Sequence, residues 1–246
     1  MTGQRASTEQ GASTGQGAST GQSASTGLRG RLALAAPTLD RAARTLWTAA
    51  GPDDLRGRYL RYLTAMHALI TASVPLLERA ADRCGQLHDA CAPLLADYFA
   101  RHAREERGHD HWLLEDLAAA SGSPEAAKAA VPPPLVVELA GAQYYRIEHR
   151  HPVALLGYIA VLEGNAPAPG LADRLAADTG LPAAAFRTLR EHAALDTGHL
   201  DDLCQLLDAL PLTAQQQLET SVCALHTADT LTRLFLQLAA DQGGRR

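Results

Sequence analysis

The stretch LREHAALDTGHLDDL, residues 189–203, combines regularly spaced leucines with side chains that can bind a metal. His192, Asp196 and His199 are spaced i, i+4 and i+7, so on an α-helix they form a single stripe. The leucines beside them indicate that this stripe borders a hydrophobic core rather than water. Two imidazoles and one carboxylate at this spacing can chelate a transition metal. A set of hydrogen-bonded core histidines is the alternative interpretation.

A second stretch, HAREERGHDHWLLED at residues 102–116, carries another such pattern. Glu106 and His109 are three residues apart and His102 lies seven before His109, so one helix would present all three on one face. Glu-x-x-His is the spacing by which one helix of a bundle offers a carboxylate and an imidazole to a metal site. An exposed charged helix has the same pattern, so this motif alone does not decide between the two.

The third feature is Glu163, which ends the apolar stretch PVALLGYIAVLEG at residues 152–164. A carboxylate there lies either at the surface or paired inside, because burying it unpaired costs free energy. The candidate ligands of the three stretches are three histidines and three carboxylates on three helices: Glu106, His109, Glu163, His192, Asp196 and His199. This set favours a dinuclear iron site over zinc, since structural zinc sites prefer thiolates and catalytic zinc needs only three protein ligands.

The composition predicts an all-α protein, because alanine and leucine dominate and aromatic residues make up only 4%. The chain has 246 residues, 46% of them hydrophobic, which is enough for one sizeable core. The formal net charge of −5 and the lack of a basic cluster argue against a nucleic-acid partner.

The N-terminal region repeats every six residues between positions 3 and 26 and offers almost nothing to bury. We expect a disordered low-complexity tail over 1–36, followed by a single helical domain over 37–246. Periodicity and breaks at glycine and proline predict helices over 38–49, 53–82, 86–120, 124–129, 134–150, 153–163, 170–179, 182–209 and 212–240. The segment 86–120 is either one helix or two joined near Pro93.

The cysteines and the apolar segments indicate where in the cell the protein is located. Cys84, Cys91, Cys204 and Cys223 form no C-x-x-C pair and are expected to be buried free thiols. The N-terminus lacks the apolar segment of a secretory signal. The longest uncharged apolar stretch, 152–162, is shorter than the roughly 20 residues that span a bilayer. We therefore expect a soluble, cytoplasmic protein without a membrane partner.

The motifs resemble those of a known family, the heme-oxygenase-like diiron oxidases and oxygenases, also described as iron-containing redox enzymes. The resemblance spans about residues 55–240 and rests on three stretches in the same order: HAREERGH at 102–109, EHRHP at 148–152 running into LEG at 162–164, and HAALDTGH at 192–199. It implies a heme-oxygenase-like bundle of about seven core helices in which carboxylates and histidines hold two irons without heme.

Carried over by position, the resemblance implies six metal ligands: Glu106, His109, Glu163, His192, Asp196 and His199. Three points stay open. Glu105 could take the place of Glu106, His102 could join, and Glu78 could supply a further carboxylate from the first core helix.

The family resemblance also implies an activity. We expect an enzyme that uses two Fe²⁺ ions and O2 to oxidise a small organic substrate, by N-oxygenation of an amine or by oxidative desaturation or cleavage of an amino or fatty acid. An external electron donor and a homodimer are compatible with the sequence. The residues that could line a substrate cavity are Tyr144, Tyr145, Arg146, His151 and Tyr158.

Two other classes of function stay open. A metal-free relative on the same bundle, either a cofactorless oxidase or a thiaminase-like hydrolase, would need Cys84 or Cys91 as nucleophile in the hydrolytic case, and neither has a base beside it in sequence. A non-catalytic binding or regulatory protein would keep the bundle and only store a metal or ligand.

Overall fold

Helices account for all the regular structure in the described part of the chain. The computed structural model describes residues 22–49 and 51–240, without the side chains of 196 and 197. The α-helices are α1 (Ala24–Leu46), α2 (Pro52–Cys84), α3 (Ala92–Glu105), α4 (His109–Ala119), α5 (Pro124–Ala129), α6 (Pro134–His149), α7 (Leu155–Glu163), α8 (Leu171–Thr179), α9 (Arg187–Ala209) and α10 (Ala214–Ala240). Two short 3₁₀ helices, η1 (Pro152–Ala154) and η2 (Ala183–Phe186), precede α7 and α9.

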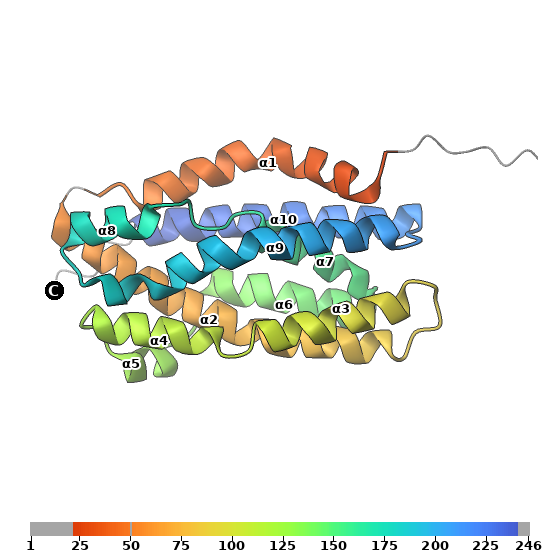
Figure 1. The fold of residues 1–246 in the computed structure, drawn as a ribbon, viewed down its shortest axis with the longest axis horizontal. Helices are drawn as coiled ribbons and strands as arrows, with labels where there is room; N and C mark the ends of the chain where they lie inside the picture. Colours follow the sequence, from red (N-terminus) through yellow and green to blue (C-terminus); the bar gives the residue numbers. More distant parts are fainter. Residues whose placement is uncertain (1–21, 50, 241–246) are drawn as a thin grey trace, which may run out of the picture.

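The expected all-α class is confirmed over these residues, which contain no strand. Seven of the helices, α1, α2, α3, α4, α6, α9 and α10, have eleven or more residues. In Figure 1, α1 and α10 run along one side of the bundle and α3 and α4 along the other, with α9 crossing in front.

The first helix begins earlier than the sequence prediction. Residues 24–36, expected in the disordered tail, belong to α1, which continues through Pro37. Leu28 and Leu39 are eleven residues apart, three turns of a helix, and both are buried, so the apolar period already begins inside the predicted tail. Residues 1–21 of the predicted tail lie outside the described residues.

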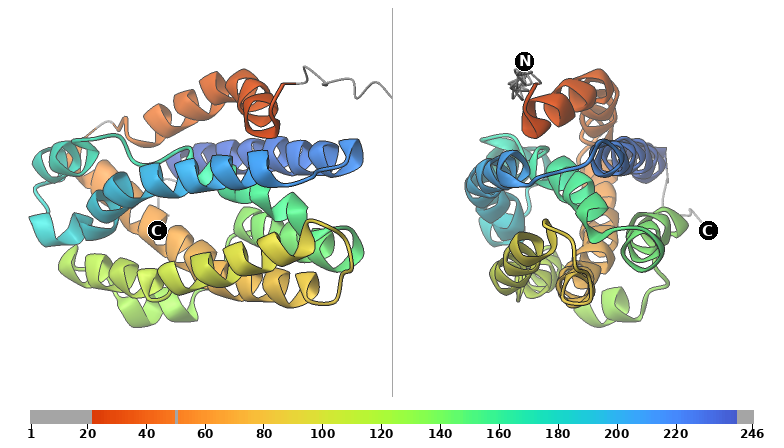
Figure 2. Two further views of the ribbon diagram at one scale, coloured as in Figure 1. Left: turned by 45° about the vertical axis from the view of Figure 1, so that its right-hand side comes forward. Right: turned by 90° about the vertical axis from the view of Figure 1, so that its right-hand side faces the viewer.

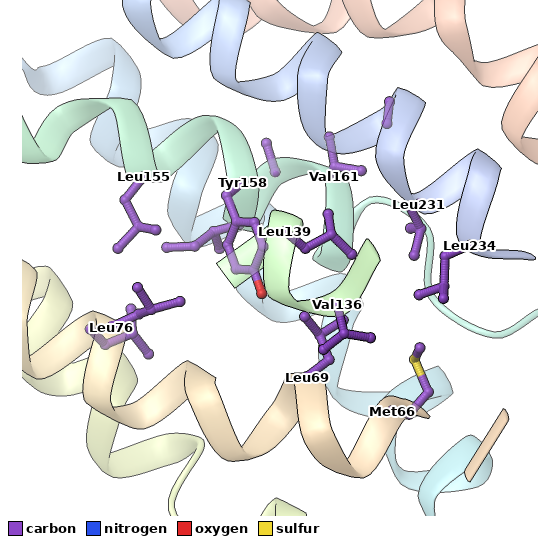
Figure 3. Packing of buried hydrophobic residues seen from close by; sticks show 14 of the residues in the cluster. Met66, Leu69, Leu76, Val136, Leu139, Leu155, Tyr158, Val161, Leu231 and Leu234 are labelled. Atoms are coloured by element: carbon purple, nitrogen blue, oxygen red, sulfur yellow. The ribbon is translucent and has the colours of Figure 1, made fainter. Parts of the chain in front are cut away.

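Two helices form the centre of the bundle. The segment Leu155–Val161 of α7 is buried on all sides, and the end-on view in Figure 2 places α7 among the other helices. Figure 3 shows leucines and other apolar side chains of α2, α6, α7 and α10 converging on one core. α2 is long and apolar enough to cross a membrane by length and composition, a test that a core helix also passes; here it contacts α3, α4, α6, α8 and α10.

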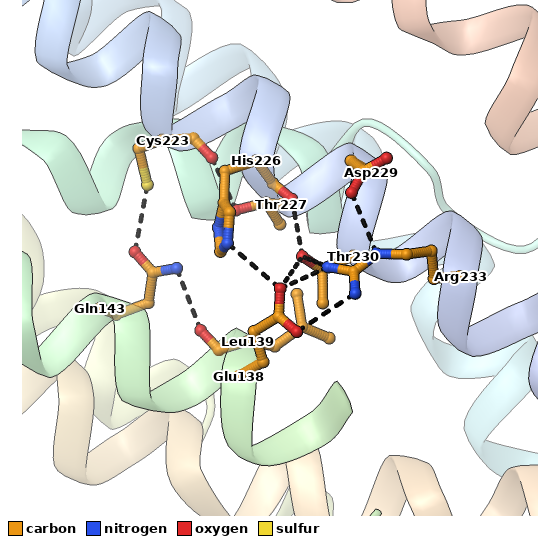
Figure 4. Close-up of polar contacts among 9 residues, drawn as sticks. All are labelled: Glu138, Leu139, Gln143, Cys223, His226, Thr227, Asp229, Thr230 and Arg233. Atoms are coloured by element: carbon orange, nitrogen blue, oxygen red, sulfur yellow. Dashed lines mark hydrogen bonds and ion pairs between the residues drawn. The ribbon is translucent and has the colours of Figure 1, made fainter. Parts of the chain in front are cut away.

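Polar contacts join α6 to α10 beside this core (Figure 4). Glu138 pairs with Arg233 and accepts a hydrogen bond from the Thr230 hydroxyl at 3.2 Å. Deeper inside, the Cys223 thiol donates to Gln143 Oε1 at 3.1 Å. All four cysteines are free thiols; Cys84, Cys91 and Cys223 are buried as predicted, whereas Cys204 is half-buried.

Candidate metal centre

The helix is interrupted inside the second candidate metal-binding motif, residues 102–109. α3 ends at Glu105, Glu106 is its C-cap, and α4 begins at His109. Gly108 between them has φ of +97°, a left-handed conformation that strains any residue with a Cβ. The prediction of one helix over 86–120, or of two joined near Pro93, was therefore wrong, because Pro93 lies in the first turn of α3, where proline is tolerated.

One group of side chains surrounds Glu163 at the end of α7. This Glu163 cluster consists of Glu163, His102 and His199. The Glu163 carboxylate lies 3.5 Å from His102 Nε2 through one oxygen and 3.2 Å from His199 Nδ1 through the other. The two imidazole rings meet edge to face, with centroids 5.1 Å apart.

Glu163 and the histidines around it shift one another's pKa. Burial raises the pKa of Glu163, but hydrogen bonds to His102 and His199 outweigh it and lower the pKa to about 2. The hydrogen bond to Glu163 raises the pKa of His199 to about 9. The carboxylate therefore stays ionised inside the protein, which is the form that binds a cation.

A second group surrounds Glu106. This Glu106 cluster consists of Glu106, His109 and His192. Glu106 Oε2 lies 3.2 Å from His109 Nδ1, and both side chains are buried. The His109 and His192 rings meet edge to face at 5.2 Å. Burial raises the pKa of Glu106, but the hydrogen bond and the charge of His109 more than reverse this, so the pKa lies below its usual value.

The two clusters meet at their carboxylates. One donor atom each of His102, Glu106 and Glu163 lies within 4.8 Å of the others, and the same holds for His102, Glu105 and His199. Glu106 Oε1 is buried and has no hydrogen-bond partner among the described residues. Each cluster thus offers one carboxylate and two imidazoles, and the unpartnered oxygen of Glu106 is free to bind a cation.

Five of the six residues expected as ligands come together in these clusters, and the side chain of Asp196 lies outside the described residues. His102, left open by the sequence, joins the first cluster, and Glu105 lies 3.6 Å from it on the solvent side. Glu78 instead pairs with the exposed Arg107 at 2.6 Å and belongs to neither cluster.

Sequence reasoning missed a residue that positions the second cluster. Asp116 of α4 is fully buried, and its carboxylate accepts the backbone N–H groups of Arg187 and Thr188, each at 2.9 Å. Asp116 therefore caps the N-terminus of α9 and ties the helix of His109 to the helix of His192. The sequence carried no distinct signal for it, because the exposed Glu115 directly precedes Asp116 and the pair is typical of a charged helix surface.

A cavity of about 490 Å³ borders both clusters. His102, Glu106, Glu163 and His192 form part of its wall, and most of the rest is apolar. Several of these apolar side chains, among them Met66, Leu69, Leu76, Leu155 and Leu231, are labelled in Figure 3. Of the five residues expected to line a cavity, Tyr158 does so; Tyr144, Tyr145, Arg146 and His151 are not among its lining residues.

Comparisons with known proteins agree with this fold. A family model described as "iron-containing redox enzyme" matches residues 67–232. A domain of unknown function with a heme oxygenase-like fold from Shewanella denitrificans is 17% identical, with a TM-score of 0.67 over 87% of this chain and 88% of its own. A TenA homolog from Pseudomonas syringae pv. tomato is 15% identical, with a TM-score of 0.67 over 89% of this chain and 97% of its own. No curated protein matches the chain.

Proposed function

Because the chain belongs to the family of iron-containing redox enzymes, we propose that it is a non-heme diiron oxidase or oxygenase. In this proposal it activates O2 to oxidise a small organic substrate, by N-oxygenation of an amine or by oxidative desaturation or cleavage of an acid. The proposed ligands are Glu106, His109, Glu163, His192, Asp196 and His199, with His102 as an additional candidate.

The observation that carries the proposal is the convergence of buried carboxylates. Glu106 and Glu163 come from different helices, yet with His102 they bring three donor atoms within 4.8 Å of one another. Two ionised carboxylates would not be buried so close together without compensating positive charge. The histidines supply it in the metal-free protein, and metal cations held by these side chains would take over that role.

The donor set fits iron. Each cluster supplies oxygen and imidazole nitrogen, with no thiolate, and mixed carboxylate and histidine ligation is the usual environment of non-heme iron. Iron bound there would supply the redox chemistry that activates O2. The chain's own part is to position the ligands through the Asp116 cap, to hold the carboxylates ionised, and to keep water away with the apolar cavity wall.

The rival with a cysteine nucleophile has less support. Burial raises the pKa of Cys84 to about 12 and also raises that of Cys91, so neither forms the reactive thiolate readily. Neither side chain lines the cavity.

Anaerobic reconstitution with Fe(II) tests the proposal. The protein is loaded, the iron per chain is counted, and the sample is exposed to O2 while the visible absorption is followed. We expect about two tightly held irons per chain and a transient absorption band. Less than one tightly held iron per chain, with no transient in the presence of candidate amines and acids, would refute the diiron assignment. Tight iron without O2 reactivity would favour a metal-storing protein.

A further inference from the structure

Trp112 packs directly against the candidate metal centre. Its indole ring stacks on the His109 imidazole, with ring centroids 4.0 Å apart and an angle of 25° between the planes. It also meets the His192 ring edge to face, at a centroid distance of 6.2 Å. His109 and Trp112 are three residues apart in α4, so the helix itself places them on one face. One aromatic ring is therefore in contact with one proposed iron ligand and lies beside another.

The same ring reaches the protein surface without lining the cavity. Trp112 is half-buried, and neither Trp112 nor His109 is among the residues of the cavity wall. The guanidinium of Arg187, the first residue of α9, lies over the indole with Cζ 4.9 Å from the ring centroid. Arg187 is exposed where α9 begins beside α4 (Figure 1). Trp112 thus connects solvent with the candidate metal centre by a path that does not pass through the cavity.

The Glu163 cluster has a similar stack that does not reach solvent. Tyr98 lies parallel to the His102 ring, with centroids 5.6 Å apart, but Tyr98 is only 4% exposed. Trp47, the other tryptophan of the chain, is half-buried and packs on two tyrosines of α2. Of the two aromatic rings that stack face to face on candidate ligands in the described part of the chain, that of Trp112 is the more accessible.

The proposed function needs electrons from outside the chain. Complete reduction of O2 takes four electrons, of which N-oxygenation of an amine or desaturation of a C–C bond supplies two. In N-oxygenation one oxygen atom forms the N–O bond and the other leaves as water; in desaturation both leave as water. The other two electrons must come from a donor, with two protons from water. A carrier protein with an iron–sulfur cluster gives one electron in each encounter, so two encounters complete one turnover.

We propose that Trp112 is the electron-entry residue of this protein, and that an iron–sulfur carrier delivers its electrons at the surface of α4 and α9 around it. Each electron leaves the cluster of the carrier, passes through the indole ring to His109 and reduces ferric iron held by His109 to the ferrous form. This role rests on the proposed function and adds a partner to it.

Three properties of the site favour this role. Electron tunnelling weakens steeply with distance, and the stacked indole places a conjugated bridge in contact with a ligand. The Arg187 cation over the ring disfavours positive charge on the indole, so Trp112 passes electrons without being oxidised itself. A carrier protein is too large to enter the cavity, and it therefore has to deliver its electrons through the protein surface.

Stopped-flow reduction of the iron-loaded full-length protein tests the proposal. Wild type and Trp112→Leu are loaded, the iron per chain is counted, the iron is oxidised to the ferric form, and reduced ferredoxin is added without O2. The absorbance of ferredoxin reports each transfer, so no substrate turnover is involved. We expect Trp112→Leu to accept electrons more slowly by about tenfold or more, because leucine has no conjugated ring, and Trp112→Phe to lie between the two. Dithionite, whose small radical anion can use the cavity, should reduce all three at similar rates.

Trp47→Phe is the matched control, because Trp47 is also half-buried but its ring packs on tyrosines. It should be reduced by ferredoxin at the wild-type rate. The proposal would be overturned by a wild-type rate in Trp112→Leu, by equal slowing with ferredoxin and dithionite, or by no transfer from ferredoxin to the iron-loaded wild type.

A second measurement leaves Trp112 in place. In Trp47→Phe the one remaining tryptophan is Trp112, so the emission lifetime reports its coupling to a bound metal. Ferric iron should shorten this lifetime by about fivefold or more, whereas zinc, which has no redox chemistry, should not. Equal lifetimes with the two metals would overturn the proposal. A wild type that holds less than one iron per chain contradicts the proposed function before any electron is added. Normal loading with unaltered ferredoxin kinetics in Trp112→Leu overturns the entry route alone.

Discussion

Glu106 Oε2 and His109 Nδ1 lie 3.2 Å apart although a helix ends at one residue and a new helix begins at the other. The left-handed Gly108 between them turns the chain, so the pair is held by a tight connection rather than by one helix face. This geometry leaves Glu106 Oε1 buried and open for a cation.

The first prediction concerns this oxygen. Glu106→Gln should lower iron loading by at least tenfold, because the amide is neutral and binds iron poorly. Helix content should be unchanged, since Gln has nearly the same shape. Glu78→Gln is the control: it removes an exposed carboxylate that pairs with Arg107, and it should load iron as the wild type does. Iron per chain, determined after dialysis, separates the two.

Gly108→Ala should destabilise the fold by about 1–2 kcal/mol, because a Cβ is strained at a φ of +97°. Nothing lies within 4 Å of the added Cβ, so the cost is conformational and not a clash. Urea unfolding measures it. We also expect weaker iron binding, since any relaxation at Gly108 moves His109. Unchanged stability would mean that this connection is not under conformational constraint.

Gly157 allows α7 to cross α10 closely. A Cβ there would overlap the Thr220 carbonyl oxygen and lie 2.8 Å from Ala224 N. Gly157→Ala should therefore destabilise the protein by about 1–3 kcal/mol or more. Gly141→Ala, in the interior of α6 with open space around it, should instead stabilise by about 0.5–1 kcal/mol. Thermal unfolding tests whether the Gly157 variant is less stable and the Gly141 variant more stable than the wild type.

Asp116→Ala should cost about 1–3 kcal/mol, because it leaves the buried N–H groups of Arg187 and Thr188 without their acceptor. The start of α9 should then exchange amide hydrogens faster, and iron should bind more weakly because His192 is less well positioned. The measurement is hydrogen exchange of residues 187–192. A general loss of stability would speed exchange along the whole chain and not at these residues in particular. Uniformly faster exchange along the chain would argue against a specific positioning role.

The contact between Asp208 and Ser25 should make docking of α1 sensitive to acid. The Asp208 carboxylate accepts the Ser25 backbone N–H at 2.9 Å and its hydroxyl at 2.7 Å. The hydrogen bond from the Ser25 backbone N–H is the main cause that lowers the pKa of Asp208 below its usual 3.8. A lowered pKa stabilises the fold above pH 3.8, and this contribution is lost as the pH falls through the lower folded-state value.

Asp208→Ala should therefore lower the melting temperature near neutral pH, and the difference from wild type should shrink in acid. Asp97→Ala provides the control, since Asp97 is an exposed helical aspartate away from Ser25. If the difference in melting temperature between the variant and the wild type were the same at neutral pH and at pH 3, the Asp208 charge would not be what holds α1 in place.

The helices could be predicted largely from the sequence, because a helix depends on contacts three and four residues apart and on local breaks. The predicted segments 124–129 and 134–150 match α5 and α6 to within one residue. Two predictions were wrong, the start of the first helix and the helix over 86–120, and both errors had local causes that the apolar periodicity did not reveal. Leu28 and Leu39 extend α1 into a segment of tail-like composition, and Gly108 ends α3 in the middle of an uninterrupted helical pattern.

The sequence alone determined the all-α class and the motifs that carry His109, Glu163, His192 and His199. Only the tertiary structure decided which side chains meet. His102 joins Glu163 across two helices, Glu78 turns to the surface, and Asp116 caps a helix 71 residues away. The physical reason is that spacing along one helix specifies a face, whereas a site between helices depends on how those faces pack.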